Sequence, residues 1–291
     1  SDFFQFLDLR PQMQEPTNPK CIPSSLSQGI QFHHVTFYYP GSDRPALKNF
    51  SLTIPAGSIV AIVGNNGAGK STLLKLLCRL YDPQQGQITL DGIDLRSFKT
   101  ADLRRAITVL FQQPVRYNAT AAENIVLSRL AGEAWGEEWS HHVQALKPEI
   151  TQAALAAGAD QPIARLPQGY DTLLGKWFAT GTDLSVGEWQ RISLARAFLR
   201  PAPIVILDEP TSAMDSWAEA DWLSRFRALV QGQTAIVITH RFTTAMRADL
   251  IYVMVNGEIV ESGHHDQLIA ANGLYAQSWT AQMGGIGKIE V

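Results

Sequence analysis

The chain carries the stretch Gly64-Asn65-Asn66-Gly67-Ala68-Gly69-Lys70-Ser71, which fits the pattern G-x-x-x-x-G-K-[ST]. An apolar run at residues 58–63 comes directly before this stretch, and residues 71–80 read as a helix directly after it. A strand, a glycine loop and a helix in this order form one half of a βαβ unit. The sequence therefore predicts an α/β fold with a loop that binds phosphate groups.

The residues of this loop have distinct expected roles. Glycines allow the backbone N–H groups to turn inward around a β-phosphate, and the start of the helix adds positive partial charge. Lys70 is expected to reach the β- and γ-phosphates, and the Ser71 hydroxyl is expected to ligate Mg²⁺. The flanking strand and helix disfavour the alternative, a glycine turn with a chance Lys-Ser pair. The predicted contacts are Gly64, Asn65, Asn66, Gly67, Ala68, Gly69, Lys70, Ser71 and Thr72.

Composition limits the class of protein. The 291 residues are 45% hydrophobic and 18% charged, as in a globular chain rather than a disordered one. The net charge of −3 offers no positive field for a polyanion, so we expect no nucleic-acid partner. Every apolar run is far shorter than the roughly 20 residues of a membrane helix. Cys21 and Cys78 are interpreted as reduced thiols.

The pattern of residues changes along the chain. Prolines between residues 11 and 23 disfavour a helix and indicate that residues 1–28 form an extended linker. Strand-like runs at 30–39 and 50–54 predict a β-rich beginning, and residues 120–166 predict a mostly helical subdomain. The continuous apolar runs 204–207 and 234–238 are typical of parallel strands that are covered on both faces.

Two acidic residues, Asp208 and Glu209, follow the first of these apolar runs. Parallel sheets present ligands at the carboxyl ends of their strands, so Asp208 is expected to bind Mg²⁺, directly or through water. Glu209 is expected to deprotonate the water that attacks a γ-phosphate, and general-base catalysis contributes about 10²–10⁴-fold. The alternative is an Asp-Glu pair that caps a following helix.

The sequence Leu184-Ser185-Val186-Gly187-Glu188 precedes a helix that is predicted over residues 189–200. Ser185 and Gly187 then lie at a helix N-terminus, where N–H groups can contact a second phosphate. In isolation, this stretch would be interpreted only as a helix cap.

Together these residues resemble the ATP-binding cassette of ABC transporters. Residues 64–71 are similar to its Walker A motif, residues 184–188 to its signature sequence and residues 204–209 to its Walker B motif with the catalytic glutamate. Four further positions are similar to the A-loop aromatic that stacks on adenine, the Q-loop glutamine, the D-loop and the switch histidine. These positions are Tyr39, Gln112, Asp215 and His240.

The resemblance implies a fold and an arrangement of domains. The fold would be that of a P-loop NTPase of the ABC ATPase type, with a RecA-like parallel-sheet core, an N-terminal antiparallel β-subdomain and a helical subdomain at about 115–200. Residues 29–282 would form the nucleotide-binding domain. Residues 1–28 would link it to an upstream membrane domain, and residues 283–291 would form a tail.

The resemblance also implies the function. ATP and Mg²⁺ would be the cofactors, and ATP hydrolysis would energise export. The partners would be a second nucleotide-binding domain, in a head-to-tail homodimer with two ATP molecules at the interface, and a transmembrane domain in the same polypeptide or complex. The location would be the cytoplasmic face of a bacterial inner membrane, and the fragment alone would be soluble.

The predicted site residues fall into three groups. The catalytic group is Lys70, Gln112, Glu209 and His240. The metal ligands are Ser71, Gln112 and Asp208. Besides the phosphate loop, the nucleotide contacts are Tyr39, Ser185, Gly187 and Asp215. Gln112 can contact both Mg²⁺ and the attacking water, with an ordinary surface glutamine as the alternative.

Two stretches depart from the family pattern, and both concern coupling to the membrane partner rather than hydrolysis. Val186 replaces a signature glycine, and Lys176-Trp177-Phe178 replaces an acidic Glu-Arg-Gly stretch.

Two other functions stay open: a soluble ABC-type ATPase that acts on ribosomes or DNA, and a scaffold that binds nucleotide without hydrolysing it. Neither a second cassette nor a coiled-coil insertion is visible, and Glu209 with His240 disfavours the scaffold.

Overall fold

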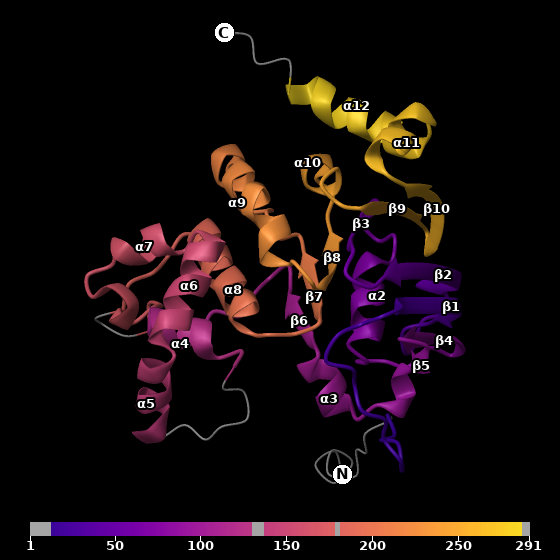
Figure 1. The fold of residues 1–291 in the computed structure, drawn as a ribbon. Coiled ribbons are helices and arrows are strands. Elements are labelled where there is room, and N and C mark those ends of the chain that lie inside the picture. The colour runs from indigo at the N-terminus through magenta and orange to yellow at the C-terminus, as the bar shows by residue number, and fades with distance from the viewer. Residues whose placement is uncertain (1–12, 130–136, 178–180, 287–291) are drawn as a thin grey trace.

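The computed structural model describes residues 13–129, 137–177 and 181–286 (Figure 1). Within these ranges the strands form one six-stranded sheet and one four-stranded sheet. The predicted aromatic start of the linker, Phe178 and the end of the tail lie outside the described residues. No helix in the described part of the chain is long and apolar enough to span a lipid bilayer.

The six-stranded sheet is the core, with the strand order β10-β9-β3-β8-β7-β6. Strands β3, β8, β7, β6 and β9 run parallel, and β10 is antiparallel to β9. Every residue of β3, β7 and β8 is buried, which explains their continuous apolar runs. The strands are β3 (Ile59–Val63), β6 (Ile107–Leu110), β7 (Ile204–Asp208), β8 (Thr234–Ile238), β9 (Leu250–Val255) and β10 (Glu258–Gly263).

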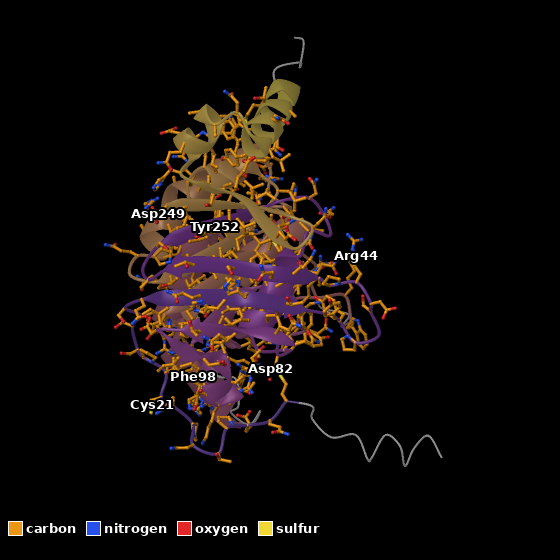
Figure 2. All side chains as sticks on the ribbon, turned by 90° about the vertical axis from the view of Figure 1, so that its right-hand side faces the viewer. Cys21, Arg44, Asp82, Phe98, Asp249 and Tyr252 are labelled. Carbon is orange, nitrogen blue, oxygen red and sulfur yellow. The ribbon has the colours of Figure 1, made fainter. Side chains whose placement is uncertain are left out.

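The four-stranded sheet is antiparallel, with the order β2-β1-β4-β5. It lies beside the core and faces the viewer in Figure 2. The Tyr252 hydroxyl of β9 donates to the Thr53 carbonyl of β2 at 2.6 Å, so the two sheets are joined at this edge. The strands are β1 (Gly29–Phe37), β2 (Leu47–Pro55), β4 (Gln85–Leu90) and β5 (Ile93–Asp94).

Two groups of helices accompany the sheets. One group packs around the sheets and comprises α2 (Lys70–Leu77), α3 (Thr100–Arg105), α9 (Ser216–Leu229), α10 (Phe242–Ala245), α11 (His265–Ala270) and α12 (Leu274–Ile286). The other group forms a separate helical subdomain on the left of Figure 1. It comprises α4 (Ala121–Val126), α5 (Glu137–Ala145), α6 (Lys147–Ala157), α7 (Asp160–Ala164) and α8 (Val186–Leu199).

Several element boundaries differ from the prediction. The helix after the phosphate loop ends at Leu77 rather than residue 80, because Arg79 takes a positive φ of 47°. Helix α8 begins at Val186 rather than residue 189, because Ser185 and Glu188 form a capping box. Residues 13–28 contain no helix, as their prolines predict.

Asn124 holds the helical subdomain to the loop that enters it. Its side chain is fully buried, and its Nδ2 donates to the carbonyls of Tyr117 at 2.9 Å and of Ala119 at 3.1 Å. Its Oδ1 accepts from Arg196 Nη2 of α8 at 3.1 Å. One amide therefore satisfies groups of both the entering loop and the helix that carries residues 186–199.

We predict that Asn124→Ala lowers the free energy of unfolding by about 2–4 kcal/mol, because it removes the hydrogen bonds of a buried amide to two main-chain carbonyls and to Arg196. Chemical denaturation followed by circular dichroism measures this change. Gln144→Ala, at an exposed position of α5, is the control and should change the midpoint little. Equal midpoints for the two variants would contradict the role of Asn124.

Candidate functional site

The phosphate loop connects β3, which lies inside the sheet between β9 and β8, to helix α2. Gly69 has a φ of 104°, a left-handed conformation that L side chains rarely adopt. A Cβ atom at Gly69 would lie 2.9 Å from the Ala46 carbonyl oxygen and 2.8 Å from the Met254 methyl carbon. The glycine is thus required by both the turn and the close packing of the loop.

Lys70 is the first residue of α2 and lies across this loop. Its Nζ donates to the carbonyls of Gly64 at 2.6 Å and of Asn65 at 3.0 Å. The side chain is buried, and this burial lowers the pKa of Lys70, while the carboxylates of Glu209 and Asp208 oppose the shift. The ammonium group therefore sits at the centre of the loop, close to two acidic groups.

A cavity of about 280 Å³ opens over the loop. Tyr39 lines one part of it, and its hydroxyl lies 3.0 Å from the Thr72 hydroxyl. The Tyr39 ring makes edge contacts with Phe37 and Tyr81 at centroid distances of 5.0 and 5.6 Å. The cavity is lined by Tyr39, Ala46, Asn66, Gly67, Gly69, Lys70, Ser71, Thr72, Gln112, Asp208 and Glu209.

Asp208 is the last residue of β7 and brings a buried carboxyl group to this cavity. Burial raises the pKa of Asp208 to about 6; the neighbouring Glu209 also raises it, and Lys70 lowers it. A carboxyl group in this setting gains from a nearby cation, because the cation offsets the cost of burying the charge.

Glu209 lies in a strained turn after β7. It has a positive φ of 51°, and its N–H donates to the Ile238 carbonyl at 2.8 Å. Gln190 of α8 donates to the Glu209 carbonyl at 2.9 Å and accepts from the Ala213 N–H at 3.1 Å. The alternative that Asp208 and Glu209 cap a helix is wrong, because α9 begins at Ser216 and is capped by Asp215.

The Glu209 carboxylate contacts His240. Its Oε1 lies 2.8 Å from His240 Nδ1, and its Oε2 accepts from the Thr239 hydroxyl at 3.4 Å. Glu209 is buried, whereas the side chain of His240 is 56% exposed. A buried carboxylate beside an accessible imidazole can accept a proton from water and hold it at the edge of the cavity.

The structure brings most of the predicted site residues together. The phosphate loop, Tyr39, Gln112, Asp208 and Glu209 meet at one cavity, and His240 joins them through Glu209. Ser185, Gly187 and Asp215 do not line that cavity. Those three residues lie at the N-termini of helices α8 and α9.

The start of α8 packs against the turn that precedes α9. A Cβ atom at Gly187 would lie 2.7 Å from the Ala213 carbonyl oxygen, so only glycine allows this approach. Ser185 caps α8 and its hydroxyl bonds to Glu188, while Asp215 accepts from the Ala218 N–H at 2.9 Å. These residues therefore form one exposed edge, separate from the phosphate loop.

Ser71, Gln112 and Asp208 offer a hydroxyl, an amide oxygen and a carboxylate to the same cavity. Mg²⁺ prefers oxygen ligands and is usually bound by one or two side chains together with substrate phosphates. The donor set therefore fits Mg²⁺. Within the described ranges, no group of three or more His, Cys, Asp or Glu residues could hold a metal ion by itself.

Sequence reasoning missed some residues of the site. Gln190 and Thr239 hold the main chain and the carboxylate of Glu209, and the ammonium of Lys75 lies 5.1 Å from the centre of the Tyr39 ring. A neutral glutamine on a helix and a threonine at a strand end give no distinctive pattern.

Cys21 and Cys78 are free thiols, as predicted, and burial raises the pKa of Cys78 to about 11.

Comparison with known proteins defines the class to which this fold and site belong. The family described as ABC transporter matches residues 47–212, which is more than half of the chain. The chain therefore belongs to the ABC transporter family, as a nucleotide-binding ATPase domain. Its two sheets and its helical subdomain confirm the predicted fold class.

Several relatives are similar over nearly the whole chain. The ATP-dependent lipid A-core flippase of Sodalis glossinidius is 42% identical over 281 residues, covering 97% of this chain and 45% of that protein. The protein of the same name from Salmonella typhimurium is 41% identical over 271 residues, covering 93% and 44%. A solved structure of a bacterial Atm1-family ABC exporter with ATP bound has a TM-score of 0.84 and 37% identity, covering 97% and 46%. The chain spans less than half of each relative.

The raised pKa of Asp208 predicts that stability depends on pH. The folded-state pKa of about 6 lies above the ordinary value of 3.8. The stabilising contribution of Asp208 to the free energy of unfolding is therefore fully present below about pH 4 and is lost as the pH rises through 6. Without nucleotide or metal, Asp208→Asn should therefore stabilise the protein at pH 8 by about 1–3 kcal/mol and change little at pH 4.

Thermal unfolding in a chelator at the two pH values measures this effect. Asp43→Asn, at an exposed turn position, is the control and should show no such difference. A destabilisation by Asp208→Asn at pH 8 would show that the buried charge is not a cost to the folded state.

Proposed function

We propose that this chain binds ATP with Mg²⁺ in the cavity over the phosphate loop and hydrolyses it to drive export by a membrane transporter. One observation carries the proposal: a single cavity is lined by the ring of Tyr39, by the phosphate loop and by Glu209, whose carboxylate contacts His240. This order matches the base, the phosphates and the bond to be cleaved in ATP.

The base and the phosphates are bound by different means. Tyr39 offers a stacking face without hydrogen bonds that identify the base, so base selectivity should be loose. The N–H groups of the loop and the Lys70 ammonium would bind the β- and γ-phosphates. Ser71, Gln112 and Asp208 would hold Mg²⁺, which when bound neutralises charge on these phosphates.

Glu209 is the proposed general base. Its carboxylate is fixed by Thr239 and by the turn that Gln190 holds, so it can orient and deprotonate a water molecule beside the γ-phosphate. The His240 side chain is largely exposed and contacts Glu209, and it would hydrogen-bond the γ-phosphate. Gln112 would contact both the metal ion and the attacking water.

The separate location of Ser185, Gly187 and Asp215 supports a head-to-tail dimer. These residues lie on an exposed edge at the starts of α8 and α9, not at the chain's own cavity. The N-terminus of a helix favours anions, so α8 of a second copy would complete the phosphate site of the first. Two ATP molecules would then be enclosed between two copies.

The rest of the transporter is inferred from the relatives. Because the chain spans less than half of proteins named as flippases, residues 1–28 are proposed to link it to a membrane domain. Residues 29–282 would be the nucleotide-binding domain, with its helical subdomain at about 115–200, and residues 283–291 a tail. The cassette would then act at the cytoplasmic face of a bacterial inner membrane, and a lipid is the first substrate to test.

We predict that Glu209→Gln retains ATP binding and lowers hydrolysis at least about 100-fold, because the amide cannot take a proton from water. The ATP-bound dimer should then accumulate, which light scattering after gel filtration would detect as a doubled mass. Nucleotide affinity and phosphate release are measured on the same preparation.

Glu258→Gln, at an exposed position of β10, is the matched control and should behave as the parent. Hydrolysis by Glu209→Gln at the parent rate would mean that the general base is another group.

A further inference from the structure

We propose that Gln282, on the C-terminal helix α12, is a positioning residue that holds the loop carrying His240 in its place for ATP hydrolysis. The inference rests on the proposed roles of Glu209 and His240, since Gln282 is argued to act only through them. It assigns a task in the reaction to a helix that contributes no residue to the cavity.

The contact consists of two hydrogen bonds from one side-chain amide. Gln282 Nε2 donates to the His240 carbonyl at 3.1 Å, and Gln282 Oε1 accepts from the Phe242 N–H at 2.8 Å. Phe242 is the first residue of α10, and Arg241 supplies no side-chain cap for this helix. Gln282 therefore caps α10 and fixes the peptide groups on either side of Arg241.

Aromatic side chains around this contact keep α12 against the loop. The Phe242 ring lies 5.1 Å from the ring of Tyr275 and 6.4 Å from that of Trp279, both on α12. Tyr275 is fully buried, and its hydroxyl lies 2.8 Å from His265 Nδ1 of α11. Helix α12 lies above α10 in Figure 1, and these ring contacts join the two helices beside the hydrogen bonds of Gln282.

The start of α12 is anchored to the sheet. The Glu261 carboxylate of β10 accepts from the N–H groups of Leu274 and Tyr275, the latter at 3.0 Å. A negative charge at the N-terminus of a helix is favourable. Helix α12, which carries Gln282, is therefore attached to the same sheet that carries the phosphate loop.

The loop is held on its other side by α9. The Arg241 guanidinium bonds to the buried Glu219, which also accepts from the Thr244 hydroxyl at 3.1 Å. Before the loop, the Thr239 N–H donates to the Ile62 carbonyl at 3.1 Å. With Gln282 in place, the main chain on both sides of His240 is held, and the Glu209 carboxylate contacts its ring.

This arrangement predicts which kinetic constant depends on Gln282. A displacement of about 1 Å at a catalytic group can cost about 100-fold in rate. Gln282 touches neither the phosphate loop nor Tyr39, so its loss should lower kcat much more than the affinity for ATP.

The test compares Gln282→Met with Gln277→Met in the complete protein. Methionine keeps the length of the side chain but removes both hydrogen bonds, and Gln277 is an exposed glutamine of the same helix. We expect Gln282→Met to lower kcat about tenfold with the KM for ATP within about twofold of the parent. Amide exchange in residues 239–246 should accelerate only in this variant. Gln282→Glu, which keeps the acceptor for Phe242, should give an intermediate rate.

Three results would overturn the inference. One is equal kcat for the two methionine variants; another is unchanged amide exchange in residues 239–246. The third is a loss of ATP affinity in parallel with kcat, which would indicate general damage to the fold. A parent protein without ATPase activity would instead contradict the proposed function, and the exchange comparison would still decide whether Gln282 holds the loop.

Discussion

The site depends on the close packing of the phosphate loop against the chain on either side of it. Gly69 turns through a left-handed conformation between the Ala46 carbonyl and Met254 of β9, where a side chain has no room. Strand β3, which precedes the loop, is paired on both sides, and the Gly257 N–H after β9 donates to the Ala68 carbonyl of the loop at 2.9 Å. The N–H groups of the loop are thus oriented before any ligand arrives, which removes an ordering cost from binding.

The same packing concentrates charge that a ligand would balance. Lys70, Asp208 and Glu209 are all buried. Glu209 also has a positive φ, a backbone conformation that residues other than glycine rarely adopt. Burial raises the pKa of Asp208 and lowers that of Lys70, so each charge is less favourable than in water. These are costs to the folded chain, and functional sites commonly retain such costs because they serve binding or catalysis.

The sequence predicted the elements whose patterns are local. Continuous apolar runs predicted strands β7 and β8, and the glycine loop predicted the strand before it and the helix after it. It did not reveal the contacts of Gln190 or Gln282, because a neutral amide on a helix has no pattern that indicates a partner far away in the chain. Motif order also could not show that Ser185 lies away from the chain's own cavity, since a motif defines residue types and not distances.

The central claim is that the loop around Lys70 binds the phosphates of a nucleotide, with the aromatic ring of Tyr39 contributing less. Calorimetric titration of the protein with ATP, ADP and adenosine, each with Mg²⁺ and at low temperature, tests it most directly. The account predicts that ATP and ADP bind at least about 100-fold more tightly than adenosine, since charge-assisted hydrogen bonds to phosphate are the strong ones. Equal affinities for adenosine and ATP would contradict it.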